Sequence, residues 1–159
     1  MNEQPNLPPA APERTESVLQ TWMAALTRPN ENTYARMAAS PQAKASTGYL
    51  WYFIGSLVVT LFATLVQQPI MNNMMKFYGT GNIETGNPLW VILCGAPLGA
   101  VISTVFFAIG TAIIQWIAGM FGGKGTNNQL VYVFSNILTP YLLVTSLLTL
   151  LTAIPLVGL

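Results

Sequence analysis

The sequence predicts an all-α, polytopic helical membrane protein with about three transmembrane helices and an N-terminal amphipathic helix. Charged residues make up 7 % of the 159 residues, against roughly 25 % in an ordinary soluble domain, and apolar residues make up 52 %. Such a chain has too few polar side chains to cover a water-facing surface. Three segments without any charge are also present: 49–66, 96–121 and 129–154. An uncharged apolar segment of about 18 residues or more is long enough to cross a bilayer as a helix.

The chain divides into three predicted regions. Residues 1–14 are rich in proline and polar residues, which predicts a disordered tail. Residues 15–47 are predicted to be an amphipathic interfacial segment. Residues 48–159 are predicted to form the membrane domain, with the spans at 49–66, 96–121 and 129–154.

The interfacial segment is expected to start with a short helix over 15–27, capped by Thr15 and ended by Pro29. Its apolar residues share one face: Val18, Leu19, Trp22, Met23 and Leu26. We expect this face to lie among lipid headgroups with Trp22 as its anchor. The alternative is that the same face packs on the protein's own helices. A second helix of one or two turns is expected over 30–40.

The first span begins with three aromatic residues, Tyr49, Trp51 and Tyr52, which predict an aromatic belt at the headgroup level. Pro69 is expected to end this helix, so that 67–88 forms a loop. The second span is expected to start near Ala96, because proline is tolerated in the first turn of a helix and disfavoured in its interior. Residues 89–95 then form an entry segment at the interface. One long helix kinked at Pro97 is the alternative.

Pro140 lies inside the third span and is expected to bend it, since proline leaves a backbone carbonyl without its donor. The hydroxyls of Ser135 and Thr139 are placed to satisfy that carbonyl. The second and third spans are joined by a loop containing Gly122, Gly123 and Gly125, which predicts a tight turn. A phosphate-binding loop is excluded, because Lys124 is followed by glycine rather than by serine or threonine.

Two sets of residues are candidates for helix contacts. Gly95, Gly99 and Ser103 are spaced four apart, a pattern that lets membrane helices approach closely within the chain or against a partner. Gln115 and Asn136 are polar residues deep in the second and third spans, at a similar depth in a helical hairpin. We expect an intramembrane polar pair between them; bonds to backbone carbonyls, or a place in a transport path, are the alternatives.

Several chemistries are excluded by composition. The chain has no His and no Asp, and its five Glu residues all lie outside the apolar segments. His-ligated haem, the usual metal sites and a Ser-His-Asp triad are therefore excluded. We expect no catalytic residue, no metal and no cofactor, and hence no enzyme. Cys94 is the sole cysteine and cannot form an internal disulfide. The net charge of +1 also argues against nucleic acid as a partner.

The basic residues predict the orientation. Arg28, Arg36 and Lys44 precede the first span, and Lys124 lies between the second and third. Because cytoplasmic loops carry an excess of Lys and Arg, the N-terminus and the glycine loop are expected to be cytoplasmic. The expected partners are the lipid bilayer and other membrane protein subunits.

Several sequence features recur together in one family: Trp22 with 26–29, 116–126, 129–131, Pro140 and 154–158. In these segments the chain resembles the Yip (Ypt/Rab-interacting protein) domain family, in its prokaryotic form. The resemblance implies a polytopic membrane protein with a cytoplasmic N-terminus, here in the prokaryotic inner membrane. It also implies five spans where this sequence supports three, so we expect either a truncated chain or a shortened relative.

The leading functional hypothesis is a non-enzymatic membrane scaffold or accessory subunit that packs against a larger membrane complex. It rests on the apolar helices, on the stripes of small residues and on the lack of residues for a catalytic or metal site. One alternative is a carrier or channel for a small or lipidic solute, with Gln115 and Asn136 lining the route. Another is Rab-linked membrane trafficking, which the family resemblance implies if the source is eukaryotic.

Overall fold

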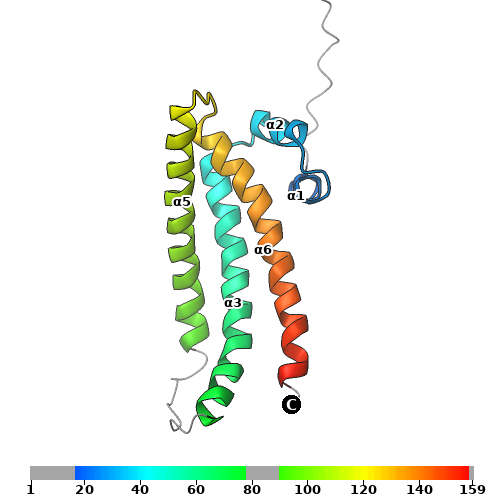
Figure 1. Cartoon of the computed structure of the whole chain (residues 1–159), viewed down its shortest axis with the longest axis vertical. Helices are drawn as coiled ribbons and strands as arrows, with labels where there is room; N and C mark the ends of the chain where they lie inside the picture. The colour runs from blue at the N-terminus through cyan, green and yellow to red at the C-terminus, as the bar shows by residue number, and fades with distance from the viewer. Residues whose placement is uncertain (1–16, 78–89, 158–159) are drawn as a thin grey trace, which may run out of the picture.

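The computed structural model describes residues 17–77 and 90–157, and every regular element within them is a helix. Three long helices stand side by side in Figure 1: α3 (Ala45–Phe77), α5 (Ala96–Met120) and α6 (Asn127–Val157). Each is long and apolar enough to cross a membrane, with candidate spans at Ala45–Val66, Ile92–Met120 and Asn127–Thr149. The predicted all-α class with three membrane-crossing helices is therefore confirmed.

Helix α3 stands between the other two, as Figure 1 shows. Both α5 and α6 contact α3 more extensively than they contact each other. Helices α3 and α6 run parallel, because Gly48 lies against Val131 and, seven residues later, Gly55 lies against Thr139. Helix α5 runs in the opposite direction: the Thr60 hydroxyl donates to the Ala96 carbonyl at 3.1 Å near the start of α5. The two helices joined by the glycine loop are thus held together through a third.

Helices α3 and α6 approach closely along a line of small and hydroxyl-bearing residues, which we call the α3–α6 seam: Gly48, Gly55, Val131, Ser135 and Thr139. A methyl group added at Gly48 would lie 2.9 Å from the Val131 carbonyl oxygen. Val131, Ser135 and Thr139 are fully buried. Close approach of this kind is how helices associate within a bilayer, where apolar side chains gain little by leaving lipid.

An aromatic cluster joins α3 to α5. The Phe107 ring stacks on Tyr52, with centroids 4.1 Å apart, and meets Tyr49 edge-on at 6.0 Å. The hydroxyl of Tyr52 also lies 3.2 Å from that of Ser103. These two tyrosines therefore contact the neighbouring helix, and their place in a belt at the headgroup level stays a prediction.

Two of the expected helix ends are also wrong. Helix α3 continues past Pro69 to Phe77, and α6 continues past Pro155 to Val157. A proline inside a membrane helix removes one backbone bond, and such helices tolerate that loss. The rest of the predicted 67–88 loop, residues 78–88, lies outside the described residues.

The second span begins earlier than expected. A π-helical turn, η1 (Val91–Gly95), leads directly into α5, and Pro97 lies in the first turn of α5. In a π turn each carbonyl accepts from the N–H five residues later in the chain. Pro97 itself has no N–H to donate. The expected start near Ala96 is therefore wrong, because residues 91–95 continue helically into α5 as the alternative of one long helix has it. A kink at Pro97 and an interfacial position of this segment stay predictions.

Two short helices, α1 (Val18–Thr27) and α2 (Glu31–Ala39), lie across α6 near its N-terminal end (Figure 1). Ser17 and Gln20 form a reciprocal capping box at the start of α1. The expected cap, Thr15, lies outside the described residues. Asn30 caps α2 by accepting from the Thr33 backbone N–H at 2.8 Å, which confirms the second short helix.

Helix α1 divides its apolar residues between two sides. Trp22 faces inward, where its ring meets Trp51 edge-on at 5.4 Å and its indole N–H is buried without a hydrogen-bond partner. The expected role of Trp22 as a headgroup anchor is therefore wrong. Leu19, Met23 and Leu26 remain exposed on the other side. Their exposure fits the interfacial location, which stays a prediction.

Candidate functional site

The expected hydrogen bond between Gln115 and Asn136 is not formed. Gln115 Nε2 donates to the Gly125 carbonyl at 2.7 Å, and Asn136 Nδ2 donates to the Tyr132 carbonyl at 2.8 Å. The equal depth inferred from a helical hairpin was misleading, because α3 rather than α5 lies along α6. The alternative of bonds to backbone carbonyls is correct for both amides.

The glycine loop has the geometry of a Schellman motif. At the end of α5, the Gly123 N–H donates to the Ala118 carbonyl at 2.8 Å and the Gly122 N–H to the Gly119 carbonyl at 3.1 Å. Gly122 has a φ of 80°, in the left-handed region that favours glycine. The carbonyl of Gly125 accepts the bond from Gln115. The predicted tight turn thus has a specific role for each glycine.

We expect Gly122→Ala to lower the free energy of unfolding by about 1 to 2 kcal/mol, the cost of a left-handed conformation for an L-residue. Gly119→Ala is the matched control: Gly119 is helical and nothing lies within 4 Å of an added methyl group. That control should be neutral or stabilising by up to about 1 kcal/mol. Unfolding of both variants in mixed micelles tests this, and equal effects would contradict the assigned role of Gly122.

Helix α6 starts with a capping box that the sequence reasoning missed. The Gln129 N–H donates to the Thr126 hydroxyl at 3.3 Å, and the Thr126 N–H donates to Gln129 Oε1 at 3.0 Å. The signal was present as Thr-x-x-Gln directly before an apolar segment. The cap fixes the start of α6 at Asn127, two residues earlier than predicted.

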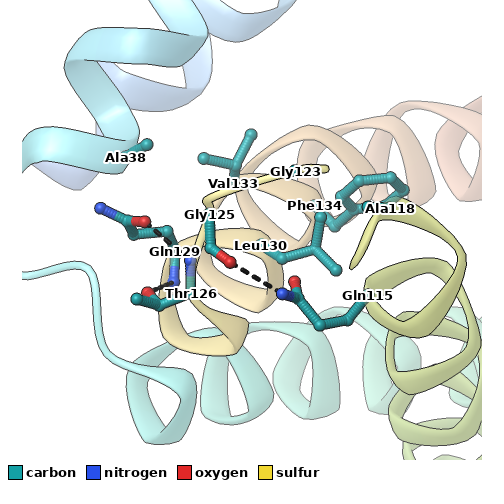
Figure 2. A pocket seen from close by; sticks show the side chains of 10 residues that line it. All are labelled: Ala38, Gln115, Ala118, Gly123, Gly125, Thr126, Gln129, Leu130, Val133 and Phe134. Carbon is teal, nitrogen blue, oxygen red and sulfur yellow. Dashed lines mark hydrogen bonds between the residues drawn. The ribbon is translucent and has the colours of Figure 1, made fainter. Parts of the chain in front are cut away.

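A pocket of about 230 Å³ opens where α2, α5 and α6 meet the glycine loop (Figure 2). We call it the loop-end pocket. Figure 2 shows Gln115 reaching from α5 to Gly125 at one side of it, with Ala38 of α2 on the opposite side. Its walls are the following residues: Ala38, Gln115, Ala118, Gly123, Gly125, Thr126, Gln129, Leu130, Val133 and Phe134.

The side chains that line the loop-end pocket are all uncharged. Its polar side chains are two amides and one hydroxyl, from Gln115, Gln129 and Thr126, and its remaining walls are apolar side chains and glycine backbone. These groups bind by hydrogen bonding and apolar contact and supply no acid or base. Within residues 17–77 and 90–157, no three His, Cys, Asp or Glu side chains gather to hold a metal ion.

The small residues at the start of α5 have different surroundings in the structure. Gly99 faces α3, where an added methyl group would lie 3.1 Å from Thr60 Cγ2. Ser103, also on α5, lies next to Tyr52 of α3. Gly95 is exposed and belongs to the π turn. The contacts of Gly99 and Ser103 are thus within the chain, while fully buried Ala96 and Ala100 complete the close-packed side.

Pro140 is buried within α6, and its neighbours do not act as expected. Ser135 donates its hydroxyl to the Tyr132 carbonyl at 2.8 Å. The hydroxyl of Thr139 is buried and has no hydrogen-bond partner. The prediction that these two hydroxyls satisfy the carbonyl freed by Pro140 is therefore wrong. Thr139 instead turns its methyl group toward Gly55 in the α3–α6 seam.

Four basic residues meet at one end of the molecule, which we call the basic end. Arg28 follows α1, Arg36 lies in α2, Lys44 precedes α3 and Lys124 lies in the glycine loop. Glu31 is the one acidic residue that the described part of the chain places there. The loop-end pocket opens at this same end, because two of its lining glycines flank Lys124.

Comparisons with protein-family models, with curated proteins and with solved structures gave no match to this chain.

Proposed function

We propose that the protein is a non-enzymatic integral membrane scaffold or accessory subunit, which packs its helices against a larger membrane complex. The observation that carries this proposal is the asymmetry of α5. The side facing α3 is built from small residues and the Phe107 ring, whereas the opposite side exposes an array of bulky apolar side chains: Leu98, Ile102, Val105, Phe106, Ile109, Ile113, Trp116 and Met120. Such a surface fits either lipid or the helices of another membrane protein.

A groove between α3 and α5 supports a protein neighbour. It has a volume of about 360 Å³ and is lined by Tyr49, Phe53, Val101, Thr104, Val105 and Ala108. Small side chains at Thr104 and Ala108 leave room between the larger ones. A large side chain from a neighbouring helix can enter such a groove and gain dispersion contacts there.

The carrier alternative has less support. It places Gln115 and Asn136 along one solute route, and each amide instead donates to a backbone carbonyl on its own side of α3. Flux through proteoliposomes that disappears in Gln115→Leu combined with Asn136→Leu would favour the carrier over the scaffold.

The proposal also includes the cellular location of the chain and its family. We place the chain in the prokaryotic inner membrane with its N-terminus in the cytoplasm, because the basic end gathers Arg28, Arg36, Lys44 and Lys124. Membership of the Yip domain family also stays a proposal, which rests on the sequence resemblance alone. Rab-linked trafficking would apply only to a eukaryotic source.

The scaffold proposal is tested by purification in a mild detergent from the native membrane. We expect a stoichiometric membrane partner, and we expect Ala108→Trp, which fills the α3–α5 groove, to lower its recovery about tenfold. Leu147→Trp is the control, since Leu147 is exposed on α6, outside both the lining of the groove and the exposed array of α5. Recovery of the wild-type chain without a partner would contradict the proposal. Equal loss in both variants would contradict the groove as the contact.

A further inference from the structure

We propose that the loop-end pocket binds an anionic phospholipid, with part of the lipid inside the pocket and its headgroup beside Lys124. This proposal does not depend on the scaffold function, because the lipid would bind the isolated chain. It rests on the depth of the pocket, on its lining and on the charge of the basic end.

The depth of the pocket matches the boundary of a bilayer. Two candidate spans meet there, one ending at Met120 and the next beginning at Asn127. The pocket is lined by residues on both sides of that boundary, from Gln115 and Ala118 near the end of α5 to Leu130 and Val133 in α6. Where helices leave the hydrocarbon layer, the glycerol and ester groups of a phospholipid are the neighbouring chemistry.

The lining of the pocket matches that part of a lipid. Apolar walls from Ala118, Leu130 and Phe134 suit methylene groups, and the amides of Gln115 and Gln129 stand near the loop, as Figure 2 shows. Pockets that enclose a whole small molecule usually measure about 300 to 1,000 Å³. At about 230 Å³ the loop-end pocket suits one portion of a larger molecule, the remainder of which stays in the bilayer.

The charge around the pocket selects an anionic headgroup. Lys124 is exposed between Gly123 and Gly125, which both line the pocket. The basic end carries four basic residues and one acidic residue among those that the structure describes. Basic residues near the helix ends attract the anionic headgroups of the cytoplasmic leaflet. A neutral solute would gain nothing from this charge.

The test uses the purified full chain in detergent micelles that contain equal amounts of phosphatidylglycerol and phosphatidylcholine, with bound lipid measured by native mass spectrometry. We expect phosphatidylglycerol to be retained about tenfold over phosphatidylcholine. Ala118→Phe on α5 and Ala38→Phe on α2 fill the pocket from opposite sides, and each should reduce retention about tenfold. Lys124→Gln should reduce the preference for phosphatidylglycerol about fivefold.

Matched controls come from the same two helices. Ala112→Phe on α5 and Ala39→Phe on α2 add the same ring at exposed positions outside the pocket lining, and both should retain the lipid. Circular dichroism identifies any variant that fails to fold, and the second wall variant then decides. Three results would overturn the proposal: equal retention of both lipids, retention that survives both wall variants, or a copurifying polypeptide in place of the lipid.

Discussion

Replacing Phe107 with alanine should destabilise the protein by about 2 to 3 kcal/mol and release α5 from α3. Phe107 is 8 % exposed, and its ring contacts both Tyr49 and Tyr52. Phe→Ala changes cost about 3 to 5 kcal/mol in water-soluble cores. We expect less here, because the unfolded helices are still surrounded by apolar lipid, so the packing contacts are lost without the gain from leaving water.

The neighbouring Phe106 provides the control. Its side chain is 69 % exposed on the outer side of α5, so Phe106→Ala should change the free energy of unfolding by less than about 0.5 kcal/mol. Both variants are measured by reversible unfolding in mixed micelles. Similar losses from Phe106→Ala and Phe107→Ala would contradict the aromatic contact between α3 and α5.

Gly48→Ala should destabilise the protein by about 2 kcal/mol, although alanine is the better helix former. The added methyl group would lie 2.9 Å from the Val131 carbonyl oxygen and 3.0 Å from the Ser135 hydroxyl. The carbonyl belongs to the backbone of α6 and cannot rotate away. Helices α3 and α6 must therefore separate along the α3–α6 seam, and dispersion contacts on both sides of Gly48 are lost.

Gly110→Ala makes the same chemical change in α5, where nothing lies within 4 Å of the added methyl group. There we expect a neutral or stabilising effect of up to about 1 kcal/mol, from helix propensity alone. The sign of the effect thus separates close helix packing from propensity. A stabilising Gly48→Ala would show that α3 and α6 do not approach as closely as the structure has them.

Much of the fold could be predicted because crossing a bilayer demands long uncharged helices. The segments 49–66, 96–121 and 129–154 all lie within observed helices except Phe121, which caps α5. The α2 helix was also predictable, since Asn30 and Pro41 bracket it. Proline was a poor predictor of helix ends. Pro69 and Pro155 do not end their helices, because a membrane helix tolerates the loss of one backbone hydrogen bond.

The candidate site was less predictable. The expected pairing of Gln115 with Asn136 was wrong because it assumed that α5 and α6 lie against each other, and their intramembrane position stays a prediction. The two tyrosines at the start of the first span are expected in a headgroup belt, and the structure adds a contact with Phe107 that no local pattern indicates. The loop-end pocket depends on Ala38, which lies about 80 positions before the α5 residues it faces, and no local pattern connects them.

Three helices suited to a membrane, and a glycine turn between the last two, could be inferred from the residues alone. No local pattern indicates that α3 occupies the middle, that α6 runs parallel to it or that α5 leaves one side open; these depend on how the helices pack. The physical reason is that lipid is as apolar as a protein core. Phe106 and Phe107 look alike in the sequence, and shape complementarity alone decides which of the two is buried.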